Sequence, residues 1–213
     1  DALVNDYGCD SLRMYELFVG PPELDAEWDD RGIDGVNRFL KRLWNLLMDS
    51  KEADVQPTKE MIKLRHKMVY DITNRLESFS LNTVISGFME YNNKFIEMAK
   101  KEGGIDKETL ETIAVLLSPF APHFAEEMWE QLGHGETIFK AGWPSYDESA
   151  MKDDEIEVPV QINGKTRAVI SISADASKDE AIAAGKEAVA DKLTGTIVKE
   201  IYVPKKIINI VQK

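Results

Sequence analysis

The spacing of hydrophobic residues changes part way along the chain, and this change most constrains what the chain can fold into. Between residues 33 and 132, apolar side chains recur every three or four positions, which gives a helix one apolar face. From residue 156 to 162, apolar and polar residues alternate, which is the period of a half-buried strand. The sequence therefore predicts a multidomain α and α+β protein rather than one uniform fold.

The first region is predicted to be an antiparallel helical bundle. Its strongest helix covers residues 33–48, where one apolar face is directed toward a core and is made of Val36, Phe39, Leu40, Leu43, Trp44 and Leu47. Before it, Asp10 is expected to cap a helix that Gly20-Pro21-Pro22 ends. Four further helices are expected, at residues 58–79, 82–101, 107–117 and 122–132.

The second region is predicted to be a small β-β-α-β-β domain. The first two strands, at 156–162 and about 165–172, are joined at Asn163-Gly164, a favoured hairpin turn. Ser177 is expected to cap a helix that reaches about Leu193, and strands follow at 197–203 and 207–211. We place the domain boundary near Asp153, within the acidic stretch 147–155, which gives segments 1–32, 33–152 and 153–213.

Composition excludes several classes of protein. The chain is 43% hydrophobic and 30% charged, which is typical of globular proteins and unlike disordered ones. Its longest apolar runs are far shorter than the roughly 20 residues that span a bilayer. One cysteine and three scattered histidines supply neither a disulfide nor a spaced set of metal ligands, so we expect a cytoplasmic protein without a metal site.

The net charge of −12 argues against simple electrostatic binding of nucleic acid, but the charge is unevenly distributed. Residues 1–34 contain ten acidic and two basic residues, whereas residues 192–213 contain five lysines and one glutamate. Such an asymmetry indicates that any anionic partner binds locally, at the uncompensated lysines.

No catalytic residue can be assigned from the sequence. The chain lacks a glycine-rich phosphate loop, a Walker lysine, a zinc signature and a nucleophile elbow. His123 follows Pro122 at an expected helix start without a local partner, so a packed or capping histidine is the favoured interpretation. Cys9 has no neighbouring cation in the sequence that would lower its pKa, and a structural thiol is favoured over a nucleophile.

Basic residues are the remaining candidates for a function. On helices they either contact a nucleic-acid backbone or form ordinary solvated faces paired with nearby acids, and the sequence gives both readings equal weight. In the second region the lysines follow the hairpin turn and crowd the last two strands, where few acids offset them. The candidates for binding are Arg38, Lys41, Arg42, Lys63, Lys67, Lys165, Arg167, Lys199, Lys205 and Lys206.

Several stretches resemble a known family. YGCDSLRMYELFVGPPELDAEWDDRGIDGVNRFLKRLWNL (7–46), VPVQINGKTRAVISI (158–172) and VPKKIINIV (203–211) are similar to the C-terminal part of bacterial class I aminoacyl-tRNA synthetases of the leucine type. LLSPFAPHFAEEMWEQL (116–132) resembles the bundle motif shared by the synthetases for leucine, isoleucine, valine and methionine. The motif at residues 116–132 leaves four amino-acid specificities open, and the other stretches narrow the choice to leucine.

The resemblance implies an anticodon-binding-type bundle followed by a small tRNA-binding domain. Residues 1–32 would then connect a missing catalytic domain to the bundle, and the acidic stretch 23–30 would face protein or solvent rather than RNA. The family's HIGH and KMSKS motifs and its editing domain are absent. The resemblance thus implies a parent ligase of protein biosynthesis that uses ATP with Mg²⁺, and a fragment that positions tRNA, holds no cofactor and is itself inactive.

Further expectations concern the ends of the chain and the rival functions. The chain opens at Asp1 without methionine, and we expect this residue to be a boundary made by cloning or cleavage. We expect a monomer whose partners are tRNA and the catalytic domain, with no membrane. The alternatives are an acidic helical scaffold that docks another protein, and the same region of a valine- or isoleucine-type synthetase.

Overall fold

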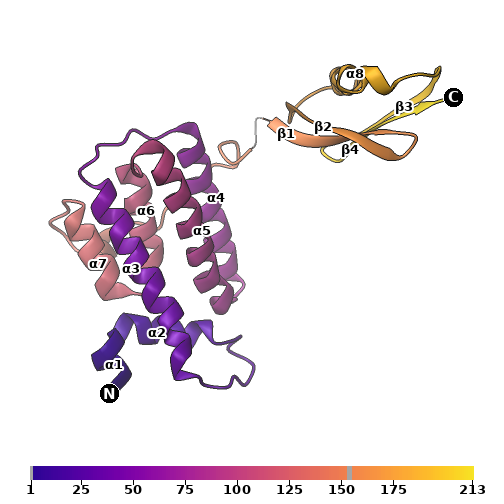
Figure 1. Cartoon of the computed structure of the whole chain (residues 1–213). Coiled ribbons are helices and arrows are strands. Elements are labelled where there is room, and N and C mark those ends of the chain that lie inside the picture. The colour runs from indigo at the N-terminus through magenta and orange to yellow at the C-terminus, as the bar shows by residue number, and fades with distance from the viewer. Residues whose placement is uncertain (1, 153–154) are drawn as a thin grey trace. The chain divides into compact units, whose positions relative to one another are not determined.

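The computed structural model describes residues 2–152 and 155–213 and confirms the predicted fold class. The chain divides into two compact units between Met151 and Lys152 (Figure 1). The first unit is helical, and the second is a four-stranded sheet with one helix. Asp153, at which the sequence placed the boundary, lies outside the described residues.

The helical unit follows the predicted periodicity closely. The predicted helix at 33–48 extends to residue 50, and the other predicted helices end within three residues of their expected limits. Three elements that the sequence did not predict are the short helix α1 and two 3-10 turns, Asp30–Gly32 and Ile138–Lys140. The helices are α1 Ala2–Tyr7, α2 Cys9–Phe18, α3 Ile33–Ser50, α4 Lys59–Glu77, α5 Leu81–Glu102, α6 Lys107–Leu117 and α7 Pro122–Gln131.

Capping residues explain where several helices begin and end. The Thr58 hydroxyl accepts a hydrogen bond from the Met61 amide at the start of α4 (3.2 Å). The Asp106 carboxylate accepts one from the Thr109 amide at the start of α6 (3.1 Å). Gly103 ends α5 with φ of 81°, a left-handed conformation that glycine adopts without strain, as predicted.

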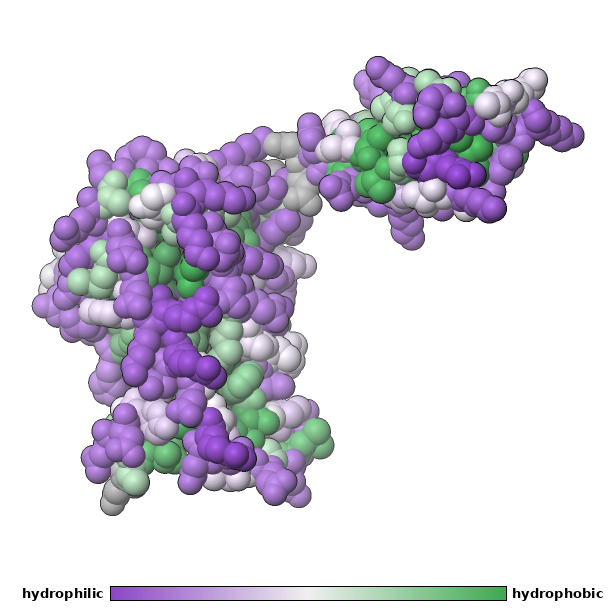
Figure 2. Space-filling view, viewed as in Figure 1, coloured by the Kyte–Doolittle hydropathy of each residue, from purple (hydrophilic) through white to green (hydrophobic). Residues whose placement is uncertain are grey.

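The apolar faces of α2 to α7 enclose one continuous core. Residues on the predicted stripe of α3, including Val36, Leu43 and Leu47, are fully or almost fully buried there. The visible surface of each unit is mostly hydrophilic and is interrupted by smaller apolar patches (Figure 2). Within the described residues, no helix is both long enough and apolar enough to cross a membrane.

Asp10 does not cap its own helix, and this prediction is wrong. Gly8 occupies the N-cap of α2 with φ of 84°, so Asp10 lies inside the first turn. Its carboxylate instead accepts a hydrogen bond from the Phe124 amide in the first turn of α7 (2.7 Å). Ala121, at the N-cap of α7, has no side-chain acceptor, so the free amides of that turn need one from elsewhere in the fold.

The small unit is built on a mixed sheet with strand order β2-β1-β4-β3. The first and last strand pairs are antiparallel, and the central pair, β1 and β4, is parallel, with Val160 opposite Ile208. The predicted helix ends five residues early, at Ala188, and a 3-10 turn follows it. The elements are β1 Glu155–Ile162, β2 Lys165–Ser173, α8 Lys178–Ala188, β3 Ile197–Val203 and β4 Ile207–Gln212.

One face of this sheet packs against α8 (Figure 1). Ser177 and Glu180 form a reciprocal capping box at the start of α8, which confirms the predicted cap. On the covered face, Val158, Val160 and Ile208 are completely buried. The residues that alternate with them along each strand point to the opposite face.

Candidate nucleic-acid interface

The exposed side of α3 forms a basic ridge. Arg38, Lys41 and Arg42 are all exposed there, and no acidic residue lies on this helix between Asp34 and Asp49. The Arg38 guanidinium donates a hydrogen bond to the Asp34 carbonyl one turn earlier (3.3 Å). We call Arg38, Lys41 and Arg42 the α3 ridge. Its positive charge is local, because the helical unit as a whole is acidic.

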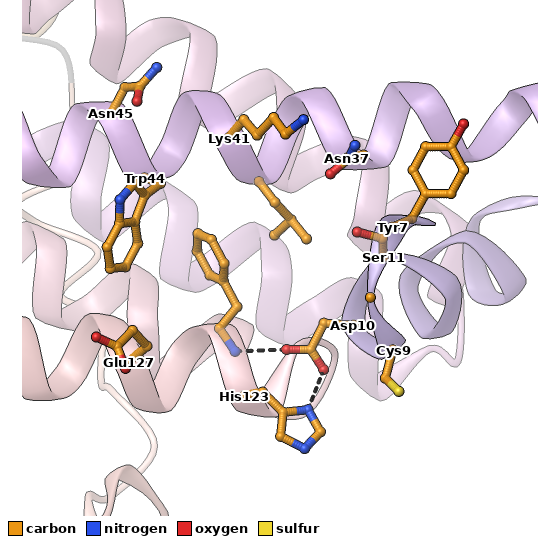
Figure 3. A pocket seen from close by; sticks show the side chains of 13 residues that line it. Tyr7, Cys9, Asp10, Ser11, Asn37, Lys41, Trp44, Asn45, His123 and Glu127 are labelled. Atoms are coloured by element: carbon orange, nitrogen blue, oxygen red, sulfur yellow. Dashed lines mark hydrogen bonds and ion pairs between the residues drawn. The ribbon is translucent and has the colours of Figure 1, made fainter. Parts of the chain in front are cut away.

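A groove of about 770 Å³ lies beside this ridge, between α2, α3 and α7 (Figure 3). We call it the α3 groove. Its floor is apolar, and the Trp44 and Phe124 rings meet edge to face there, with centroids 5.9 Å apart. Trp44 points from α3 toward α7 (Figure 3). The lining residues from α3 are Asn37, Leu40, Lys41, Trp44 and Asn45.

Asp10 lies at one end of the α3 groove, and its carboxylate is already engaged (Figure 3). One oxygen contacts the Arg13 guanidinium (2.8 Å) and Nδ1 of His123 (2.9 Å), and the other accepts the Phe124 amide (2.7 Å). The His123 side chain is 74% exposed, so of the two predicted alternatives, a packed or a capping histidine, the packed one is wrong. No local signal could have revealed the pair, since its members are 113 residues apart.

A second groove, of about 380 Å³, lies between α3 and α5 and is lined by Arg42 and Lys100. The Lys100 ammonium is 2.6 Å from the Glu97 carboxylate. This hydrogen bond, assisted by the charges of Lys100, Lys101 and Arg42, lowers the pKa of Glu97. The basic residues of this groove are therefore partly offset by neighbouring acids.

The candidates on α4 differ from the ridge in exposure. Lys63 and Lys67 are four residues apart and share one face of the helix, but both are half-buried. The Lys63 ammonium lies 3.3 Å from the Glu60 carboxylate. These two lysines therefore agree better than the residues of the α3 ridge with the interpretation of an ordinary solvated helix face that is paired with nearby acids.

The sheet separates the basic residues of the small unit. Lys165 begins β2 and Lys199 lies in β3, on opposite edge strands but near the same end of the sheet. Lys205 and Lys206 lie in the β3–β4 turn, at the other end. All of these side chains and Arg167 are exposed. From the sequence we expected the lysines of the last two strands to lie together. The strand register instead divides them between the two ends of the sheet.

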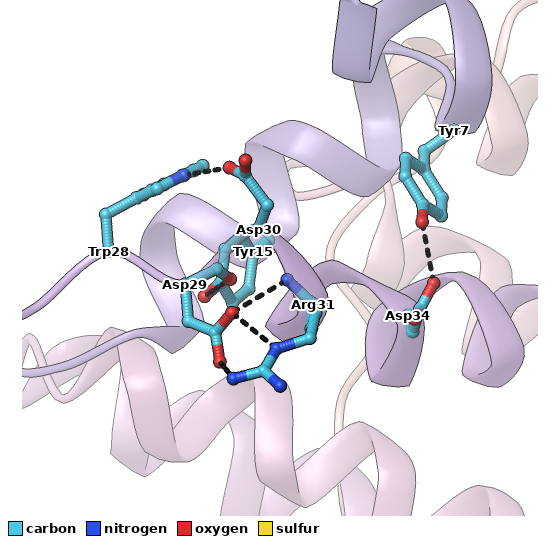
Figure 4. Close-up of polar contacts among 7 residues, drawn as sticks. All are labelled: Tyr7, Tyr15, Trp28, Asp29, Asp30, Arg31 and Asp34. Atoms are coloured by element: carbon cyan, nitrogen blue, oxygen red, sulfur yellow. Dashed lines mark hydrogen bonds and ion pairs between the residues drawn. The ribbon is translucent and has the colours of Figure 1, made fainter.

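The acidic stretch 23–30 is exposed along its length and is organised by local contacts (Figure 4). The Asp29 carboxylate accepts hydrogen bonds from the Arg31 guanidinium (3.1 and 3.2 Å) and from the Arg31 amide (3.0 Å). These bonds to Arg31 lower the pKa of Asp29. The segment thus presents negative charge to its surroundings, which makes it unsuited to contact RNA.

Tyrosine contacts fix this stretch to the helices (Figure 4). The Tyr15 hydroxyl donates to the Asp29 carbonyl (2.6 Å), and the Tyr15 ring meets the Trp28 ring edge to face at 4.9 Å. Nearby, the Tyr7 hydroxyl donates to the Asp34 carboxylate (2.8 Å), and this hydrogen bond raises the pKa of Tyr7. Residues 2–32 therefore belong to the helical unit.

Comparisons with known proteins agree with these features. The sequence profile of the family described as the anticodon-binding domain of tRNA ligase matches residues 58–182. The chain is 44% identical to a leucine-tRNA ligase of Fervidobacterium nodosum and 41% identical to one of Phocaeicola vulgatus, over 100% and 99% of its length. It spans only 28% and 23% of those two relatives.

A solved structure shares the fold. It is the LeuRS of Agrobacterium radiobacter K84, in a ternary complex with tRNA and LeuAMS, with a TM-score of 0.77 and 24% identity. The likeness covers all of this chain and 29% of that one. The profile match, which covers more than half of the chain, and the relatives confirm the resemblance found in the sequence. The chain belongs to the family of anticodon-binding domains of tRNA ligases, and its relatives named above are leucine-tRNA ligases.

Proposed function

We propose that this chain is a tRNA-binding region of a leucine-tRNA ligase that joins leucine to its tRNA with the use of ATP. The observation that carries the proposal is the family match together with leucine-tRNA ligases as relatives along the whole chain. In this role the chain positions tRNA, as a monomer attached to the rest of the ligase. The rival scaffold function and the valine or isoleucine specificities have no comparable support.

The contacts would go chiefly to phosphates and riboses, because these groups position a nucleic acid on a protein without reading its sequence. The α3 ridge would supply them in the helical unit. In the small unit, the exposed residues Lys165, Arg167, Lys205 and Lys206 would do so. Since these lysines lie at both ends of the sheet, the small unit would follow the RNA backbone over more than one phosphate.

The chemistry of the ligase is not assigned to this chain. Within the described residues, no group of three His, Cys, Asp or Glu side chains is arranged to hold a metal ion. The chain contributes binding and orientation to the proposed reaction.

Titration of the 213-residue chain with leucine tRNA at low and moderate salt tests the proposal. Binding should weaken steeply with salt, because each neutralised phosphate releases counterions. The double variant Lys205→Ala/Lys206→Ala should flatten the slope of log affinity against log salt by about two units, one per lost phosphate contact. A gel shift or filter-binding assay measures both.

A matched control removes two lysines that the proposal does not use. Lys100→Ala/Lys101→Ala changes the net charge equally, at the last turn of α5, and should leave the slope nearly unchanged. If leucine tRNA does not bind at either salt concentration, the proposed function is wrong. If the two double variants lower the slope equally, binding is non-specific and the contacts named above are wrong.

A further inference from the structure

We propose that the α3 groove holds one unpaired nucleotide of the bound tRNA, with its base on the apolar floor and its phosphate at Lys41. This inference rests on the proposed function and names a site within it. Single-stranded nucleic acid is commonly bound by an aromatic surface beside a cation, since every base has a stacking face. The α3 groove combines both features in side chains from α3 and α7.

The floor suits a flat ring. Leu40, Trp44 and Phe124 form an apolar surface, and the edge-to-face contact with Phe124 holds the Trp44 indole in place. Trp44 is only partly buried, although it lies on the predicted core stripe of α3. A tryptophan that packs on the core and still faces an open groove can accept a stacked base without a large rearrangement.

The rim suits the backbone of a nucleotide. Asn37, Lys41 and Asn45 are spaced four residues apart and therefore form one stripe along α3. The stripe presents an ammonium group between two amide side chains. An ammonium pairs with a phosphate as a point charge, and amides can donate to and accept from a ribose or a base edge. The remaining cations of the α3 ridge continue the positive charge beyond the groove.

The Lys41 ammonium favours a nucleotide over an apolar peptide. The Asp10 carboxylate at the end of the groove is paired with the Arg13 guanidinium and also contacts His123 and the Phe124 amide. The groove's other carboxylate, Glu127, accepts a hydrogen bond from Gln131 (2.9 Å). Lys41 and the exposed His123 are the basic side chains of the lining, and an apolar segment of protein would leave the Lys41 ammonium without a counter-charge.

The single cysteine of the chain reports on this site. Cys9 is exposed and lines the groove, so a thiol reagent such as dithionitrobenzoate labels the groove and no other position. Saturating leucine tRNA should slow the labelling of Cys9 several-fold. A single-stranded RNA oligonucleotide should also slow it, whereas a fully paired RNA duplex of the same length should not.

Three substitutions test the floor separately from the rim. Trp44→Leu keeps an apolar side chain but removes the stacking surface, and should weaken tRNA binding by about 5- to 100-fold. Trp44→Phe keeps an aromatic ring and should restore most of the affinity. Lys41→Ala should lower the salt slope by about one unit. The matched control is Lys94→Ala, an exposed lysine over the Tyr91 ring on α5, which should leave the slope unchanged.

The two proposals fail in different ways. Absence of tRNA binding overturns the proposed function. Normal binding combined with unchanged Cys9 labelling overturns the nucleotide site alone. Labelling that is equally slow with paired and single-stranded RNA, or a Trp44→Leu variant that is folded by circular dichroism and binds tRNA normally, also overturns the nucleotide site.

Discussion

The two units of the chain stabilise their interiors in different ways. Within the described residues, every buried polar or charged side chain belongs to the helical unit. The core of the small unit is apolar and is made by few residues from the sheet and α8. The buried polar residues of the helical unit are Asp10, Ser11, Ser50, Arg65, Asn92, Asp106, Thr109 and Ser118.

The helices are thus joined by specific polar contacts in addition to their apolar faces. The Arg65 guanidinium on α4 lies 3.4 Å from the Asp106 carboxylate, which also accepts hydrogen bonds from the amide and hydroxyl of Thr109. Helices packed by apolar contacts alone could slide or rotate against one another, and a buried polar pair fixes one arrangement. In the small unit, the hydrogen-bonded register of the strands fixes how the elements are arranged.

The largest expected loss of stability comes from replacing Arg65, the cation of the buried ion pair with Asp106. Arg65→Met should lower the free energy of unfolding of the helical unit by about 3–5 kcal/mol, because it leaves the Asp106 charge buried without its cation. Urea unfolding followed by circular dichroism measures the change.

Glu108→Gln is the control for this experiment. Glu108 lies 3.0 Å from the same guanidinium, but its side chain is 69% exposed. Its loss should cost less than about 1 kcal/mol. Equal effects of Arg65→Met and Glu108→Gln would show that the buried pair does not stabilise the helical unit beyond an ordinary surface contact.

An isoleucine-to-alanine substitution in the core of each unit tests whether the small unit unfolds after a smaller loss of stability than the helical unit does. Ile208→Ala and Ile85→Ala remove the same atoms from fully buried positions, and each should cost about 2–5 kcal/mol. Ile208→Ala should abolish the native amide signals of the sheet, since a unit of this size has little stability to lose. Ile85→Ala should leave the helical unit folded. A two-dimensional NMR spectrum of each variant separates the outcomes, and a folded Ile208→Ala sheet would contradict the comparison.

Two glycine-to-alanine changes should have opposite signs. At Gly185 on α8, an added Cβ would lie 3.0 Å from Cγ2 of the buried Ile208, so Gly185→Ala should destabilise the small unit by about 1–3 kcal/mol. At Gly35 on α3 nothing lies within 4 Å, and Gly35→Ala should stabilise the helical unit by about 0.5–1 kcal/mol. Thermal unfolding of both variants checks the signs, and a stabilising Gly185→Ala would mean that α8 can move away from the sheet.

The last predicted effect on stability depends on pH. Burial, together with the hydrogen bond to the Asp71 carboxylate, raises the pKa of Tyr91 well above its usual range. The folded state therefore keeps a proton that the unfolded state releases above about pH 10. The stability due to Tyr91 is complete below this pH and is lost as pH rises, by up to about 1.4 kcal/mol per pH unit.

A tyrosine-to-phenylalanine pair measures this loss. The difference in unfolding free energy between the wild type and Tyr91→Phe should shrink as pH rises from 9 to 11. Tyr70→Phe removes a half-exposed hydroxyl from α4 and should show no such trend. Parallel pH profiles of the wild type and Tyr91→Phe would rule out the pKa shift.

Local sequence signals predicted most of the fold. The helices α3 to α7 and the hairpin at Asn163-Gly164 depend on periodicity, caps and turn residues, which act over a few positions. The strand order β2-β1-β4-β3 could not be read in this way, because it depends on the parallel pairing of β1 with a strand about 50 residues later. Without that order, the separation of Lys205 from Lys165 could not be foreseen.

The candidate site was only partly predictable for the same reason. The exposed face of α3 follows from its stripe, so Lys41 and Arg42 were correctly expected to be exposed, and their contact with tRNA stays a prediction. The α3 groove is made by α2, α3 and α7, which are far apart in the sequence. Trp44 was assigned to the core by periodicity, because spacing alone cannot reveal where a neighbouring helix leaves a gap.

The Asp10 carboxylate has a consequence for how the chain folds as a ribosome makes it. Helix α2 emerges early, but the Phe124 amide, which donates a hydrogen bond to the Asp10 carboxylate, is made 114 residues later. Until then α7 has no cap and Asp10 is a solvated charge. The first turn of α7 is thus secured only when α2 and α7 meet, which makes the unit complete its fold as a whole rather than helix by helix.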